Sequence, residues 1–149
     1  EKDLDNWKNL HATKMMEENF LCVCSPKFKE EGKINKPQDL LKHNLLGHGH
    51  RPQIWSQYLT SLNLKKHNIH HEDIFEHFFM LIEAAKNDMG IGLVPDFLVR
   101  KELENKELTL AIEKSFKSNY DYYLLQQKYK TQPQKITDFT NWIRSVSSQ

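Results

Sequence analysis

The pattern of apolar and polar residues predicts short extended runs that alternate with helices. Two extended runs are expected near the start, at His11–Glu17 and Asn19–Ser25. The second contains a continuous apolar stretch from Phe20 to Cys24, which is typical of a strand buried on both faces. Ser25-Pro26 is expected to end this strand, because proline cannot donate a hydrogen bond to a neighbouring strand.

Apolar spacing, proline and capping residues mark the helices that follow. A short helix is expected from Pro37, and another after Pro52 with apolar residues on one face. The clearest helix is expected to begin at Asp73, with Glu76 completing a capping box, and to end at Asn87-Asp88. Its predicted buried side consists of Phe75, Phe78, Phe79, Leu81, Ile82 and Ala85.

The second half of the chain continues the alternation. Extended runs are expected at Met89–Val94, Leu108–Ile112 and Tyr120–Gln127, and helices at Asp96–Glu104 and Pro133–Val146. Short strands that alternate with helices predict an α/β fold built from βα units around a mainly parallel sheet.

Composition narrows the possible function classes. A chain of 149 residues forms one domain or two small lobes, and its net charge of +1 weakens the case for direct contact with nucleic acid. The mean hydropathy of −0.72 predicts no membrane span. Two cysteines cannot form a disulfide framework, which favours the cytoplasm. Because the sequence begins at Glu1 without methionine, we expect a fragment of a longer protein.

No residue set predicts catalysis, a cofactor or a metal site. His67, His70, His71 and His77 surround Glu72, but adjacent histidines on a strand point to opposite faces and no His-Glu-x-x-His spacing occurs. Cys22 and Cys24 are interpreted as small buried apolar residues rather than as a redox pair. We therefore expect neither an enzyme nor a metalloprotein.

A set of ordered segments carries a resemblance to a known family. These segments are Trp7–Leu10, Glu17–Pro26, Pro37–Leu46, Trp55–Leu59, Ala84–Val99, Glu102-Leu103, Leu108, Tyr122–Leu125 and Trp142. In this order they resemble the effector-binding region of LysR-type transcriptional regulators, especially the glycine-cleavage and β-lactamase regulators. The family usually has glycine where Asp88 stands and another glycine near Lys106, both at helix ends, so the sequence departs from the family at these two places. The helix-turn-helix and the start of lobe I are not in this sequence.

The resemblance implies a type II periplasmic-binding-protein-like fold, with two Rossmann-like lobes, mixed and mainly parallel sheets, and a truncated lobe I. Residues 1–24 would be part of lobe I, 25–124 would be lobe II, and 125–149 would be a crossing strand and the C-terminal helix of lobe I. The hinge would lie at Cys24, Ser25, Leu125 and Gln126.

Ligands of open α/β sheets bind beyond the carboxyl ends of strands, near helix N-termini. The residues expected there are Ser25, Pro26, His48, Gly49, His50, Asp73, Phe75, Pro95 and Asp96. Gly49 would allow close backbone approach, and the amides near Phe75 would favour an anionic ligand. For Asp73 a capping role is favoured over a ligand contact, because an ionised carboxylate repels an anion. Phe75 is favoured as a core residue.

The resemblance implies an effector-sensing domain that binds a small metabolite in the inter-lobe cleft and so alters DNA binding. Promoter DNA would be contacted by the absent N-terminal domain, and the regulator would form a homodimer or tetramer in the cytoplasm. A solute-binding protein of a transport system is the alternative, since it would share the lobed fold.

Overall fold

The computed structural model describes residues 9–64, 69, 71–128 and 133–147. The chain divides into two compact units, with Glu1–Glu18 and Lys117–Gln149 in unit 1 and Asn19–Phe116 in unit 2. Both boundaries lie inside long strands, at earlier positions than the predicted boundaries after residues 24 and 124.

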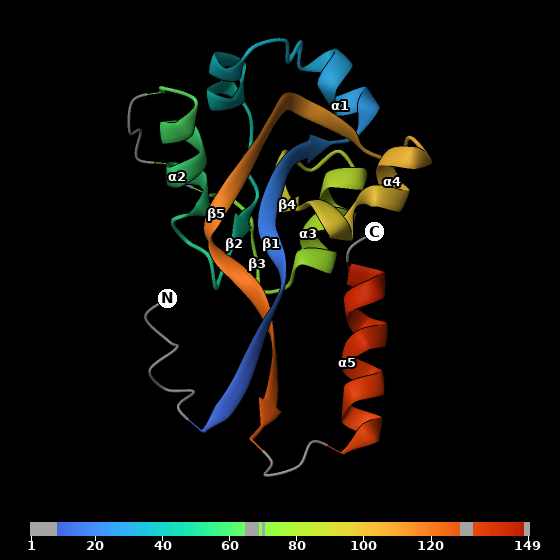
Figure 1. Ribbon diagram of the computed structural model, residues 1–149. Helices are drawn as coiled ribbons and strands as arrows, with labels where there is room; N and C mark the ends of the chain where they lie inside the picture. Colours follow the sequence, from blue (N-terminus) through green and yellow to red (C-terminus); the bar gives the residue numbers. More distant parts are fainter. Residues whose placement is uncertain (1–8, 65–68, 70, 129–132, 148–149) are drawn as a thin grey trace. The chain divides into compact units, whose positions relative to one another are not determined.

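Two long strands replace the four short extended runs predicted for the same residues. Strand β1 spans Leu10–Cys24 and strand β5 spans Thr109–Gln127 (Figure 1). Residues 113–119, the polar middle of β5, were not predicted as part of a strand. That middle stays extended because its side chains pair with β1: Lys117 Nζ lies 2.5 Å from Glu17 Oε1, and Ser118 donates a hydrogen bond of 2.6 Å to Glu18.

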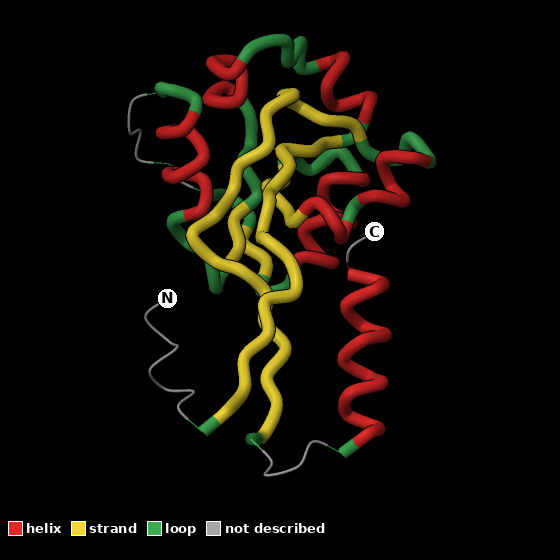
Figure 2. The backbone as a smooth tube through the Cα atoms, viewed as in Figure 1, coloured by secondary structure: helices red, strands yellow, loops and turns green. Residues whose placement is uncertain are grey.

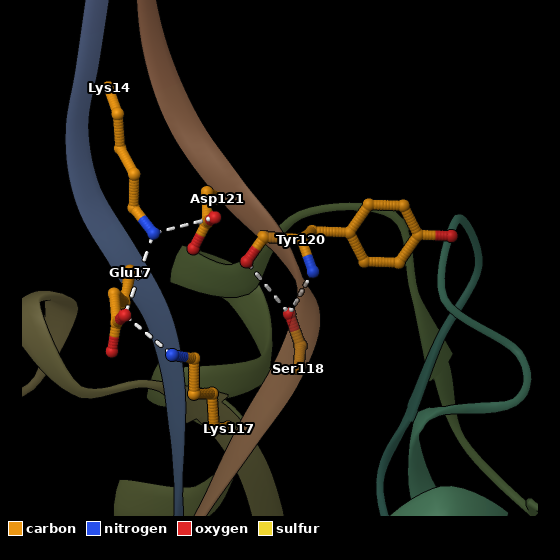
Figure 3. A network of polar contacts seen from close by, with 6 residues as sticks. All are labelled: Lys14, Glu17, Lys117, Ser118, Tyr120 and Asp121. Atoms are coloured by element: carbon orange, nitrogen blue, oxygen red, sulfur yellow. Dashed lines mark hydrogen bonds and ion pairs between the residues drawn. The ribbon is translucent and has the colours of Figure 1, made fainter. Parts of the chain in front are cut away.

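Unit 1 consists of the first part of β1, the last part of β5 and helix α5, Gln134–Ser147. Figure 3 shows a network of polar contacts between residues of its two strands. Lys14 bridges Asp121 at 2.8 Å and Glu17 at 3.5 Å, so that charges of opposite sign alternate across the pair of strands. Exposed pairs of this kind contribute little to stability, typically below about 1 kcal/mol each.

Unit 2 contains the remaining elements (Figure 2). Its helices are α1 (Pro26–Glu31), α2 (Ile54–Ser61), α3 (Phe78–Lys86) and α4 (Arg100–Glu104), with 3-10 helices at Pro37–Lys42 and Asp96–Leu98. Its short strands are β2 (Gly47–His48), β3 (Ile74–Phe75) and β4 (Gly92–Pro95). The helix predicted over Asp96–Glu104 is thus divided at the buried Val99. Helix α1 was not predicted.

The strand pairing is mixed. Strand β1 lies between β4 and β5, and it pairs with β4 in antiparallel register, from Phe20 opposite Pro95 to Val23 opposite Gly92. Strands β2 and β3 are parallel, and an isolated parallel bridge joins Leu45 to Ile91. The expected parallel pairing therefore holds for these shorter elements and not for β1 with β4.

The end of β1 is buried on both faces, as its continuous apolar stretch predicted. Phe20, Cys22 and Cys24 belong to one apolar cluster, whose largest members are Trp55 and Tyr58 of α2. Val23 belongs to a second cluster with residues of α3 and β4. Alternate side chains of a strand point to opposite faces, so this one strand separates the α2 layer from the α3 layer.

The helix predicted from Asp73 begins instead at Phe78, with His77 as its N-cap residue. The capping-box prediction is wrong because Asp73 to Phe75 pair with β2: the carbonyl oxygens of Asp73 and Phe75 accept hydrogen bonds from the amides of Gly47 and Gly49, at 2.8 and 2.9 Å. Phe79, predicted as buried, is 66% exposed. The predicted end is correct, since Asn87 caps the helix and Asp88 takes a left-handed φ of 62°.

Candidate effector site

The carboxyl ends of β2 and β3 lie together at the N-terminus of α3. His48 is opposite Phe75 in the parallel register, and Gly49 follows directly. His48 is only 7% exposed, and its ring centroid lies 4.1 Å from that of Phe78 in the first turn of α3. His50 is next to it, with 6.0 Å between the two imidazole centroids. We call His48, Gly49, His50, Phe75 and His77 the imidazole end of unit 2.

Basic side chains surround His48 at the imidazole end. The pKa of His48 is lowered, first by burial and then by the positive charges of His50, Arg51 and His77 around it. The N-terminus of α3 adds a partial positive charge, and its first turn carries no acidic residue. Glu76, which lies between Phe75 and His77 in the sequence, is not among the groups that shift the pKa of His48. Such a site favours an anion.

The tautomer of His48 follows from a backbone contact. The amide of His50 donates a hydrogen bond of 3.2 Å to Nδ1 of His48, so Nδ1 is unprotonated in the neutral ring and Nε2 carries the hydrogen. His48 therefore offers an N–H donor from its other ring nitrogen, even without positive charge.

Pro95 lies on the same side of unit 2. It is opposite Phe20 in the β1–β4 register, and the Phe20 ring lies 5.9 Å from that of Phe78. Asp96 follows Pro95 and accepts a hydrogen bond of 2.7 Å from the amide of Phe97, next to it in the chain. Asp96 is the first residue of the 3-10 helix Asp96–Leu98.

Asp73 was considered as a helix cap or as a ligand contact, and in the structure it has a different role. Its carboxylate accepts a hydrogen bond of 2.9 Å from Nδ2 of Asn44. The same Nδ2 also donates to the carbonyl oxygen of Met89 at 3.0 Å, while Oδ1 of Asn44 is buried without a hydrogen-bond partner in the described part of the chain. Asp73 therefore connects the segments before β2 and β3, at the opposite end of these strands from His48.

Ser25 and Pro26 lie at a distance from the imidazole end. Ser25 follows the last residue of β1, five positions beyond Phe20, which corresponds to roughly 16 Å along a strand. Its hydroxyl caps α1 by accepting a hydrogen bond of 2.9 Å from the amide of Phe28. Pro26 lines a separate surface cavity of about 680 Å³ beside Lys29 and Lys106. The structure does not bring Ser25 and Pro26 together with His48.

The residues predicted as a hinge lie away from the boundaries between the two units. Cys24 and Ser25 are buried in unit 2, whereas Leu125 and Gln126 belong to unit 1. Gln126 donates a hydrogen bond of 3.1 Å to Thr140 of α5. The boundaries fall at Glu18 and Phe116.

Among the described residues, no group of three or more histidines, cysteines or carboxylates could hold a metal ion. His67 and His70 lie outside the described residues, and Nδ1 of His71 is 2.6 Å from the carbonyl oxygen of Leu45. Burial raises the pKa of Cys22 far above its ordinary value and that of Cys24 to about 11, so both thiols are protonated at neutral pH. Protonated buried thiols are unreactive.

Three residues of this site were not predicted from the sequence: Arg51, His77 and Phe78. His77 was considered only as a metal ligand, and Phe78 only as a core residue. A signal for both was present, because a helix that begins three residues after a short strand would have placed them beside the strand ends.

The sequence of this chain matches a family model and several curated proteins. Residues 2–148 match the family model described as LysR substrate binding domain. The chain is 34% identical over 140 residues to a glycine cleavage system transcriptional activator homolog of Haemophilus influenzae, covering 94% of this chain and 46% of that protein. It is 31% identical over 139 residues to the glycine cleavage system transcriptional activator of Escherichia coli K12, covering 93% and 45%.

The fold has a counterpart among solved structures. The effector domain of the transcriptional regulator AmpR of Pseudomonas aeruginosa superposes with a TM-score of 0.82 at 20% identity, covering 95% of this chain and 68% of that chain. This similarity confirms the predicted fold class. The chain spans about half the length of the curated relatives that it matches. Within the described residues, no helix combines the length and apolar character that crossing a membrane requires.

Proposed function

Because the chain belongs to the family of LysR substrate binding domains, we propose that it senses an anionic effector at the imidazole end for a transcriptional regulator. The observation that carries the proposal is the position of His48, His50 and His77 at the N-terminus of α3, where two parallel strands end. The related proteins are transcriptional activators, and nothing in them supports the solute-binding alternative.

The regulatory step needs a ligand with a preference between two conformations. A ligand that binds both conformations equally shifts no equilibrium, however tightly it binds. We propose that the effector binds one conformation of a cytoplasmic homo-oligomer better than another, and that the bound conformation alters how a separate DNA-binding domain holds its promoter. In this proposal the present chain contributes sensing and has no catalytic activity.

The chemistry of the imidazole end defines the effector class. Nε2–H of His48, the rings of His50 and His77 and the first amides of α3 are hydrogen-bond donors. A small carboxylate would satisfy several of these donors at once, and the Phe78 ring offers an apolar surface beside them. Glycine, acetate and succinate are suitable probes of this class, since they differ in charge and length.

The test is a titration of the ¹⁵N-labelled protein with each of the three probes. We expect amide shifts at residues 48–50 and 75–79, and weaker binding for His77→Gln. His43→Gln is the matched control, because its imidazole contacts Gly32 and Phe28 elsewhere in unit 2. Shifts confined to other residues, or equal weakening by the two variants, would contradict an anion site at the imidazole end.

A further inference from the structure

A surface cavity of about 680 Å³ lies in unit 2, between α1, the end of α4 and the start of β5. Figure 1 shows α1 and α4 beside the first part of β5. Helix α1 contributes Pro26 and Lys29 to the lining, and residues between Leu103 and Glu113 contribute the rest. All of the lining residues belong to the described part of the chain. The volume is within the range of small-molecule pockets.

One wall of this cavity is apolar and is fixed by the core of unit 2. Its members are Pro26, Leu103, Leu108 and Leu110. Leu108 is 2% exposed, and together with Leu103 and Leu110 it packs in the cluster formed around α3 and β4. An apolar group bound in the cavity would extend this cluster and lose contact with water, which is favourable.

The cavity also carries charges of both signs, from Lys29, Lys106 and Glu113. Lys29 uses one of its three N–H donors for a hydrogen bond of 2.8 Å to the carbonyl oxygen of Leu110, so its ammonium is held against β5. Within the described part of the chain, the side chains of Lys106 and Glu113 form neither an ion pair nor a hydrogen bond. One ammonium and one carboxylate at the cavity are thus without a partner among these residues.

The backbone fixes the position of Lys106 next to the apolar wall. The amides of Glu107 and Leu108 both donate hydrogen bonds to the carbonyl oxygen of Glu102, at 2.8 and 3.1 Å, and so close the turn that follows α4. Within this turn Lys106 has a left-handed φ of 61°, a conformation that strains an L-residue and does not strain glycine. A lysine therefore occupies a position at which glycine would be more stable.

We propose that this cavity binds a small zwitterion with an apolar side chain, which is the chemistry of a free aliphatic amino acid such as leucine. The apolar wall contacts the side chain of the ligand. Lys106 pairs with its carboxylate, and Glu113 pairs with its ammonium. A ligand of one charge would leave either Lys106 or Glu113 unpaired, so a zwitterion fits this cavity better than a simple anion.

This site is separate from the imidazole end and goes beyond the function proposed for it. The two sites share no residue, since the cavity is lined by α1 and by residues 103–113. Their ligands also differ, because glycine, acetate and succinate lack the aliphatic side chain that the apolar wall requires. Each site can therefore be tested while the other is intact.

The experiment is a titration of the ¹⁵N-labelled protein with L-leucine, 4-methylpentanoate and leucinamide. The second probe is leucine without its ammonium, and the third has the ammonium but no carboxylate. We expect amide shifts at residues 103–113, and roughly tenfold tighter binding of leucine than of either other probe, because each of these lacks one charge-assisted contact. Glycine, which has both charges and no side chain, should also bind more weakly than leucine.

Two variants assign the charges. Lys106→Gln should weaken leucine and 4-methylpentanoate and leave leucinamide unchanged, whereas Glu113→Gln should weaken leucine and leucinamide and leave 4-methylpentanoate unchanged. The matched controls are Lys101→Gln and Glu104→Gln, which remove the same charges from exposed positions of α4 outside the cavity. Lys106→Gly removes both the charge and the strain, so it should bind leucine more weakly while unfolding at an equal or higher temperature. This combination excludes misfolding as the cause of the lost binding.

Three results would overturn the proposal. They are the absence of any shift at residues 103–113 on addition of leucine, equal weakening by Lys106→Gln and Lys101→Gln, and a leucine response confined to residues 48–50 and 75–79. The last result would support a ligand at the imidazole end and contradict one at this cavity. A leucine response at residues 103–113 together with a succinate response at the imidazole end would support both sites, so the two proposals succeed or fail separately.

Discussion

Ser25 donates its hydroxyl hydrogen to the carboxylate of Asp88, a residue 63 positions later in the chain. Ser25 caps α1, and Asp88 ends the α3 region with a left-handed backbone. Lys27 approaches the other carboxylate oxygen at 2.9 Å. The Ser25 hydroxyl, as the largest cause, and the Lys27 ammonium lower the pKa of Asp88. A serine that resembled a ligand contact in the sequence thus joins two helices.

Replacing Ser25 tests this structural role. Ser25→Ala removes the cap of α1 and one partner of Asp88, and we expect a loss of about 1–2 kcal/mol in the free energy of unfolding. Urea denaturation measures the loss. Ser145→Ala is the control, because its hydroxyl contacts only Trp142 on the surface of α5. If Ser25→Ala weakens effector binding while stability is unchanged, the assignment of Ser25 as a structural residue is wrong.

Two glycines of unit 2 should respond very differently to alanine. A Cβ at Gly90 would lie 2.5 Å from the backbone oxygen of Asn44, whereas a Cβ at Gly49 would meet nothing closer than 3.8 Å. We expect Gly90→Ala to destabilise the protein by about 1–3 kcal/mol through overpacking, and Gly49→Ala to stay within about 0.5 kcal/mol of the wild type. Thermal unfolding of the pair measures both effects.

The Gly49 variant also has a functional readout. Because Gly49→Ala leaves the fold unchanged, any change in its affinity for the carboxylate probes reports on the imidazole end directly. Equal loss of stability in the Gly90 and Gly49 variants would contradict the packing described here.

The sequence predicted those parts of the fold in which local pattern and tertiary environment agree. The apolar run Phe20–Cys24 is buried on both faces, and α2 lies where its apolar spacing placed it. Helix α5 has nearly the predicted bounds, but Phe139 and Val146 of its apolar side are 48% and 46% exposed. Asp88 and Lys106, each just after a helix, both take left-handed φ angles, 62° and 61°. Both residues therefore carry the steric strain that an L-residue has in the left-handed conformation.

The failures come from contacts made with distant segments. Nothing near Asp73 in the sequence indicates that Gly47 pairs with it, so a capping pattern was preferred over a strand. Residues 113–119 were not predicted as part of a strand, because Lys117 and Ser118 are paired with Glu17 and Glu18, which lie 100 positions away in the sequence. Likewise, Ser25 lies at a strand end, as predicted. Its distance from His48 depends on the antiparallel register of β1 with β4, which the apolar pattern of the sequence does not reveal.

Adjacent glutamates on β1 differ sharply in burial, and their replacement should show it. Glu18 is 1% exposed and accepts hydrogen bonds from Ser118 at 2.6 Å and from Tyr122 at 2.9 Å. Glu18→Ala leaves two hydroxyls without this acceptor, and we expect a loss of about 2–3 kcal/mol. Glu17→Ala, which removes only exposed ion pairs with Lys14 and Lys117, should cost less than about 1 kcal/mol.

Urea denaturation of both glutamate variants measures the difference. Glu18→Gln retains one acceptor oxygen and should recover part of the loss. Similar losses for Glu17→Ala and Glu18→Ala would contradict the burial of Glu18 in unit 1.

His48 should make the stability of the protein fall on acidification. Burial and the charges of His50, Arg51 and His77 lower its pKa in the folded protein. As the pH drops below the usual histidine value near 6.5, the unfolded chain takes up a proton at this residue before the folded chain does. The free energy of unfolding therefore decreases from about pH 6.5 down to the folded-state pKa and is unaffected by His48 above that window. His48→Gln should flatten this part of the curve.

A bound anion should act on the same residue in the opposite direction. Negative charge beside the imidazole end favours the protonated form of His48, so the pKa of His48 rises on binding and affinity for succinate increases as the pH falls through that pKa. The pH titration of the His48 ring proton by NMR, with and without succinate, measures both shifts directly. An unchanged His48 pKa at saturating succinate would place the anion elsewhere, whereas a rise that persists in His43→Gln and is reduced in His77→Gln would support a site at the start of α3.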